Sequence, residues 1–322
     1  NNDIVKIDWG DGYIEYYYNE VATNISHTYS SNGAYTIEIN GNFQFFENLT
    51  WVELVEDWGD YEFEGKNIFK DNNNNIQLNT ITTPNIKGDC SSMFSMGFFN
   101  QPLNNWNVSN VTNMNSMFMD VRSFNQPLNN WNVSNVTDMS YMFKFAISFN
   151  QPLDNWNVSN VTDMNHMFND ARMFNGDLNN WERNTTGDIS TLSNVLDMSH
   201  MFRSDYKTYS FNQPINNWNV SNVTDMSYMF YNEGSPDNEI YPFNQPLDNW
   251  NVSSVNDMSH MFSGAELFNK PLSNWERTSP DLSTLGNVTN MDEMFEFKST
   301  NGGLFDQDVS NWCVSQISNK PN

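Results

Sequence analysis

A fourteen-residue sequence, FNQPLNNWNVSNVT, occupies residues 99–112 and recurs letter for letter at residues 124–137. The Phe-Asn pair that opens it, Phe-Asp in the last copy, begins eight units separated by 25, 25, 25, 37, 32, 25 and 37 residues. The units start at Phe99, Phe124, Phe149, Phe174, Phe211, Phe243, Phe268 and Phe305. A fixed period with loop-sized additions is typical of a solenoid, in which each coil buries its apolar side only against its neighbours.

The apolar positions of one unit predict its local structure. In the second unit they are Leu128, Trp131, Val133, Val136, Met139, Met142 and Phe143. Trp131 and Val133 alternate with polar residues, which is strand spacing, whereas Met139 and Met142 are one helical turn apart. Thr137 or Asp138 precedes that turn as a plausible N-cap. We therefore expect a leucine-rich-repeat-like solenoid with a short parallel strand and a short helical turn in each coil.

Acidic side chains dominate the charge, with 39 Asp and Glu against 14 Lys and Arg and a formal net charge of −25. Such a polyanion is repelled by nucleic acid and by anionic membrane surfaces. No apolar run reaches the roughly 18 residues that a membrane-spanning helix needs. We therefore expect neither nucleic-acid binding nor membrane insertion. No Ser-His-Asp, Cys-His or phosphate-loop motif is present, so we do not expect an enzyme.

Residues 1–65 contain strand-like patterns and three short motifs, WGDG at residues 9–12, HTY at 27–29 and GAYTI at 33–37. Together these motifs resemble the PKD-type immunoglobulin-like β-sandwich. The resemblance implies a small β domain whose first strands are missing, because only eight residues precede Trp9. We expect an open sheet edge beside residues 3–9 that is covered by a strand from another chain or by a segment removed from this one.

The rest of the chain divides at the start of the repeats. Residues 66–98 are expected to form a junction and an entry coil, and residues 99–322 a solenoid of about eight coils with an exit coil. Cys90 and Cys313 should then lie in opposite caps, too far apart to form a disulfide bond.

The repeat itself resembles a known family. Residues 90–318, with FNQPLNNWNVSNVTDMSYMF in the second unit, are similar to the BspA-like bacterial surface-protein repeats. This resemblance implies a secreted or surface-displayed protein, often an adhesin, with a protein or glycan ligand. The chain begins Asn1-Asn2-Asp3, and we expect a mature form from which an export signal has been removed.

One slot of the repeat is acidic in five consecutive coils. Its residues are Asp138, Asp163, Asp197, Asp225 and Asp257, with Asn113 and Asn290 at the two ends. Stacked carboxylates repel one another unless something compensates them. Either each carboxylate caps its own helical turn, or the column binds Ca²⁺ together with Asn or backbone oxygens.

A second slot carries polar residues that alternate with buried Trp and Val. The candidate binding face consists of Asn107, Asn132, Asn157, Asn219 and Asn251. These side chains should face outward, where they either hydrogen-bond along the stack or form a docking surface for a glycan or a protein.

Three histidines share a third slot, which we interpret as a solvated helix position with zinc as the weaker alternative. They are His166, His200 and His260. Insertions break the period at residues 182–190, 231–242, 276–283 and 296–304, and insertions on one side of a solenoid often form its binding face.

Two functional hypotheses remain. The first is an extracellular adhesin or binding module that uses the polar face or the insertions. The second is a structural subunit of an extracellular filament, sheath or virion surface, in which copies of the chain assemble through the open N-terminal sheet.

Overall fold

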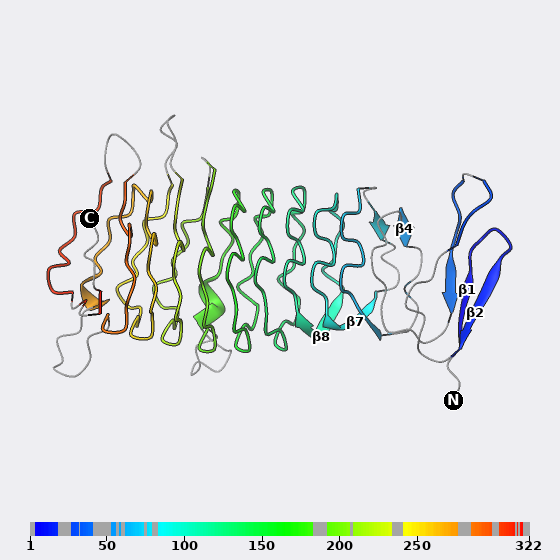
Figure 1. The fold of residues 1–322 in the computed structure, drawn as a ribbon, viewed down its shortest axis with the longest axis horizontal. Helices are drawn as coiled ribbons and strands as arrows, with labels where there is room; N and C mark the ends of the chain where they lie inside the picture. The colour runs from blue at the N-terminus through cyan, green and yellow to red at the C-terminus, as the bar shows by residue number, and fades with distance from the viewer. Residues whose placement is uncertain are drawn as a thin grey trace.

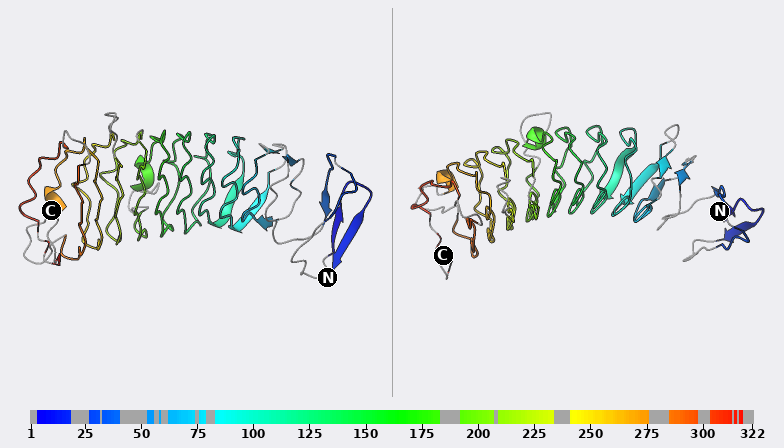
Figure 2. Two further views of the ribbon diagram at one scale, coloured as in Figure 1. Left: turned by 45° about the horizontal axis from the view of Figure 1, so that its top comes forward. Right: turned by 90° about the horizontal axis from the view of Figure 1, so that it is seen from above.

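The computed structural model describes residues 4–18, 27–31, 33–40, 53–55, 58, 62–73, 76–78, 83–182, 192–206, 209–233, 241–275, 285–297, 303–312, 314 and 316–317. The molecule is elongated, with coils placed side by side along the long axis and a separate antiparallel sheet at the N-terminal end (Figure 1). The view from above shows the same succession of coils (Figure 2). Over these residues no helix has both the length and the apolar character needed to cross a bilayer.

The N-terminal sheet has three antiparallel strands in the order β2-β1-β3. They are β1 (Ile4–Asp8), β2 (Ile14–Tyr18) and β3 (Glu38–Asn40). β1 pairs with β2 on one side and with β3 on the other. The expected open edge beside residues 3–9 is therefore wrong for β1, because the chain itself supplies both of its neighbours.

The three N-terminal sequence motifs meet in one aromatic cluster. The His27 ring stacks on Trp9 at a centroid distance of 5.0 Å and contacts the edge of Tyr29 at 4.7 Å. His27 Nε2 lies 2.7 Å from Asp11 Oδ2, and this hydrogen bond lowers the pKa of the Asp11 carboxyl. Residues far apart in the sequence thus fix the turn after β1.

The stack of coils begins earlier than the first complete repeat. β4 (Leu54–Val55) pairs in parallel with β6 (Gln77–Leu78). β5 (Glu62–Glu64), β7 (Asn85–Asp89) and β8 (Asn107–Asn113) form a parallel three-stranded sheet. One continuous hydrophobic core includes buried residues from Phe63 to Met294, so residues 66–98 belong to the stack. β7 comes directly before Cys90, so a strand precedes the entry coil.

In the later described coils the predicted strand and helical turn are both replaced by tight turns. Trp131 N donates to Leu128 O and Val136 N to Val133 O, at 3.0 and 2.9 Å. The isolated parallel bridges between successive coils join residues of the acidic slot, with one further bridge between Ser204 and Asn232. The only helices in the described ranges are two short 3-10 segments, η1 (Asn179–Glu182) and η2 (Ser273–Trp275).

The Met-x-x-Met-Phe stretch shows why a helix does not form. Alternate amides, those of Met139, Tyr141 and Phe143, donate to carbonyls of the next coil at 2.9–3.0 Å. The amide between them, Met142 N, bonds to the residue three before it within its own coil. Tyr141 and Phe145 have φ values of 59° and 60°, in the left-handed region. The chain thereby satisfies its backbone groups along the stack instead of within a helix.

In the core, equivalent side chains of successive coils stack on one another in columns. Phe118, Phe143 and Phe168 stack with centroid distances of 5.5 and 5.6 Å. Five tryptophans donate Nε1–H to a backbone carbonyl of the preceding coil at 2.8–2.9 Å. Those residues are Trp131, Trp156, Trp181, Trp250 and Trp275. Each indole therefore buries its ring and still satisfies its polar atom.

Candidate functional site

The acidic column forms as predicted, since parallel bridges connect its members from Asn113 to Asn290. In each of the five aspartates, Oδ1 accepts the backbone N–H two residues later at 2.8–2.9 Å. This is capping of a turn, although the turn is not helical. β7 adds Asp89 to the same column, where it pairs with Asn113.

Two members of the column, Asp163 and Asp225, have a raised carboxyl pKa. Burial raises the pKa of Asp163, and the carboxylates of Asp197 and Asp138 raise it further. Burial likewise raises the pKa of Asp225, next to Asp197 and Asp257. A bound cation would relieve this repulsion, so calcium at the column stays a prediction.

The candidate binding face is polar, but it does not bond along the stack. In each of its five Asn side chains, Oδ1 accepts the backbone N–H of the residue two positions later at 3.1–3.2 Å. Asn107, Asn132, Asn157 and Asn251 are exposed, and Asn219 is half-buried. Among the described residues, no hydrogen bond of their Nδ2 groups holds them to the next coil.

Two other asparagine slots bond along the stack, and the sequence analysis missed both. The Asn of each Phe-Asn pair accepts the backbone N–H of the equivalent residue one coil later at 2.8–3.2 Å. The second Asn of NVSNVT donates Nδ2–H to a carbonyl of the preceding coil at 2.6–2.7 Å. The near-invariance of these two positions among the eight units was the signal that distinguished them from the outward-facing slot.

The histidine slot is not a solvated helix position. Tyr141, His166, His200, Tyr228 and His260 form a continuous column of stacked rings with centroid distances of 4.2–4.7 Å. Burial lowers the pKa of His166 to about 3 and that of His200 to about 4. Both rings are therefore neutral near pH 7 and serve as packing.

A buried carboxyl beside this column gives a pH-dependent prediction. Asp170 is fully buried with a φ of 56°. Its Oδ1 accepts the Asp205 N–H at 2.9 Å. Burial raises the pKa of Asp170 to about 6, so the folded state binds this proton more tightly than the unfolded state.

The contribution of Asp170 to the free energy of unfolding should therefore be greatest below about pH 4, and it should fall as the pH rises from about 4 to about 6. We expect Asp170→Asn to remove that fall and to stabilise the protein by about 1–3 kcal/mol at pH 7, because asparagine keeps the acceptor and tolerates positive φ. Urea unfolding at pH 3.5 and pH 7 measures the difference. A variant that is less stable than wild type at pH 7 would show that the ionised carboxylate is favourable there.

A cavity of about 180 Å³ opens at the edge of the coils, and we call it the edge pocket. It is lined by Asp120, Arg122, Phe145, Ile147, Arg172 and Tyr206. Arg122, Ile147 and Arg172 occupy one slot in three successive coils, 25 residues apart. This site was not predicted from the sequence. The feature that could have indicated it is that two of the five arginines of this acidic chain occupy the same slot of the repeat.

The two arginines of the edge pocket are in different states. Arg122 Nε donates to Asp120 Oδ1 at 2.7 Å, and the Arg122 side chain is 68% exposed. The Arg172 guanidinium lies 3.8 Å from the centroid of the Tyr206 ring, a cation–π contact. Arg172 Nε is buried, and no acceptor in the described part of the chain reaches it. The lining of the pocket therefore includes two guanidinium groups, and one of them has a buried N–H without an acceptor among the described residues.

The periodic ladders and stacked core define the class of this molecule as a repeat protein. Three segments, residues 88–192, 182–284 and 282–322, match the family described as "Mycoplasma protein of unknown function, DUF285". The matches span more than two thirds of the sequence, and the chain belongs to this family. Comparison with curated proteins and with solved structures found no match. The family description names neither BspA-like repeats nor a PKD domain, so those two assignments stay predictions.

Proposed function

We propose that the chain is an extracellular solenoid that acts as a binding module, of the adhesin kind, for a glycan bearing a carboxylate. The solenoid is of the leucine-rich-repeat-like type in its parallel stacking, with tight turns in place of the helical turn. The observation that carries the proposal is the edge pocket, where Arg122 and Arg172 line one cavity and the buried Arg172 Nε has no acceptor among the described residues.

The charge of the edge pocket favours an anionic group. The chain as a whole carries a net charge of −25, yet Arg122 and Arg172 face one cavity whose lining includes a single acid, Asp120. Lys144 lies beside it, with Nζ 5.2 Å from the centroid of the Phe145 ring. A guanidinium matches a carboxylate because its planar donors bond both oxygens at once.

The walls of the edge pocket favour a sugar as the bearer of that carboxylate. Phe145, Ile147 and Tyr206 present apolar surface to the cavity, and a sugar ring offers C–H faces that pack on such surface. The volume of about 180 Å³ is below the range of about 300–1,000 Å³ that is usual for drug-sized ligands. It suits one terminal acidic sugar, with the rest of the glycan extending over the exposed coil edge.

A glycan array tests this proposal. The labelled full chain should be retained by glycans that end in a sialic or uronic acid and not by the same glycans without the acid. Retention by neutral glycans alone, or by none, would contradict it.

One observation favours the alternative, a structural subunit. β2 is an outer strand of the described sheet, and Tyr13, Ile14 and Tyr16 on this hairpin are 40–53% exposed. A neighbouring chain could add a strand there. Light scattering over a hundredfold range of concentration distinguishes the two functions, since a filament subunit polymerises as concentration rises and a binding module stays monomeric.

A further inference from the structure

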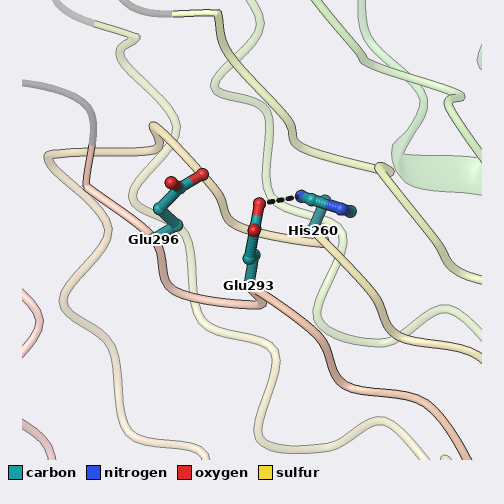
Figure 3. A group of neighbouring side chains, drawn as sticks. All are labelled: His260, Glu293 and Glu296. Carbon is teal, nitrogen blue, oxygen red and sulfur yellow. Dashed lines mark ion pairs between the residues drawn. The ribbon is translucent and has the colours of Figure 1, made fainter. Parts of the chain in front are cut away.

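Three potential metal ligands converge at the C-terminal end of the stack. His260 and Glu293 occupy the same slot in successive coils, and Glu296 follows three residues later. One ligand atom from each lies within 4.8 Å of the others. Within the described residues this is the only such group of three. Figure 3 shows the imidazole and the Glu293 carboxylate pointing toward each other, with the Glu296 carboxylate beside them.

The imidazole of His260 is held in place from two sides. Tyr228 stacks on it at 4.3 Å, and Tyr231 meets it edge-on at 6.3 Å. Its side chain is only 20% exposed, whereas that of Glu293 is 55% exposed. The site is therefore a nitrogen ligand held by its neighbours next to two exposed carboxylates, and Glu296 Oε2 accepts a hydrogen bond from Ser263 Oγ at 3.3 Å.

The contact between His260 and Glu293 has the dimensions of a pair of metal ligands. Nδ1 and Oε2 are 3.2 Å apart, yet Nδ1 is buried and makes no hydrogen bond of acceptable geometry to a described residue. Two ligands at about 2.0–2.2 Å from zinc, with an angle of 90–110°, are about 3.0–3.5 Å apart. The separation is within ion-pair distance, and it equally fits two ligands that share one ion.

We propose that His260, Glu293 and Glu296 bind a divalent transition-metal ion, Zn²⁺ in the first place, with water completing the coordination. Imidazole together with carboxylates suits zinc, whereas Ca²⁺ prefers six to eight oxygens. The Glu296 side chain is exposed, and binding the ion would replace its hydrogen bond from Ser263 Oγ.

The ion would act as a clip at the end of the stack. His260 belongs to one coil and both glutamates to the next, so a shared ion joins the last two Met-containing coils. End coils lack a neighbour on one side and are the first to fray in a repeat protein. The slot explains why the clip is confined to this end, because His166 and His200 are followed by rings and only His260 is followed by a carboxylate.

Calorimetric titration of the full chain with Zn²⁺ tests the proposal, with the thermal unfolding midpoint as a second measurement. We expect one saturable site per chain and a midpoint that rises with Zn²⁺ concentration. His260→Tyr keeps the stacked ring, as Tyr141 and Tyr228 do in the same slot, and should weaken binding at least tenfold, about 1.4 kcal/mol. Glu296→Gln should also weaken binding.

His200→Tyr is the matched control, since it makes the same change in the same column away from the carboxylates, and it should leave binding unchanged. Three results would overturn the proposal. They are no Zn²⁺ binding by wild type at millimolar concentration, binding that survives both His260→Tyr and Glu296→Gln, and displacement of Zn²⁺ by an equal concentration of Ca²⁺.

Discussion

Replacing Trp156 by alanine should destabilise the protein by about 3–5 kcal/mol, the usual effect of deleting a large buried aromatic ring. Trp156 is 1% exposed and stacks on Trp131 of the preceding coil. Its Nε1 donates to Leu128 O at 2.9 Å, so the substitution also removes one of the two hydrogen bonds that this buried carbonyl accepts, the other coming from Trp131 N. Because each coil depends on its neighbours, unfolding should spread from this position.

Chemical denaturation of Trp156→Ala and of Met173→Ala measures this effect. Met173 is the last residue of the same unit and is 55% exposed, so its truncation should change stability by less than about 0.5 kcal/mol. A loss below about 1 kcal/mol for Trp156→Ala would mean that the ring does not pack between coils.

Gly264→Ala should lower the free energy of unfolding by about 2–5 kcal/mol. Alanine is strained in the left-handed backbone region, and its Cβ would overpack against the preceding coil. Gly264 has a φ of +72°, and an added Cβ would lie 1.9 Å from the backbone oxygen of Asn232 in the preceding coil. The backbones of the two coils would have to separate to accommodate the Cβ. This movement would break the inter-coil hydrogen bond from Asn232 N to Ser263 O.

Asp120→Ala is the matched comparison for that substitution. Asp120 occupies the same slot with a φ of 57° and already carries a Cβ. Its exposed ion pair with Arg122 is worth at most about 1 kcal/mol. Equal losses for the two variants, measured by the same denaturation, would show that the close approach at Gly264 is not a constraint.

The sequence predicted the repeat and its core well, because both follow from periodic apolar side chains. In the second unit, Trp131, Val133, Val136, Met139, Met142 and Phe143 are all fully or almost fully buried. The helical turn was wrong because spacing by three and four residues is equally compatible with consecutive tight turns. What decides between them is the left-handed backbone at residues such as Tyr141 and Phe145, and their side chains give no sign of it.

The candidate sites divide in the same way. The acidic column was visible because one residue type recurs in one slot, and its capping role follows from Asp preceding a turn. The edge pocket consists of departures from the repeat, Arg122, Arg172 and Tyr206, so a search for regularity passes over it. The clip of His260, Glu293 and Glu296 depends on which residue follows in the next coil, and this requires the structural register.

Titration calorimetry with an acidic oligosaccharide tests the central claim, ligand binding at the edge pocket, most directly. The wild-type chain should bind the acidic form and not its neutral counterpart, and Arg172→Gln should weaken binding at least tenfold, about 1.4 kcal/mol. Lys270→Gln makes the same charge change at a position where other coils carry Gln126 and Gln151, and it should leave binding unchanged. Equal affinity for the acidic and neutral forms, or wild-type affinity in Arg172→Gln, would contradict the account.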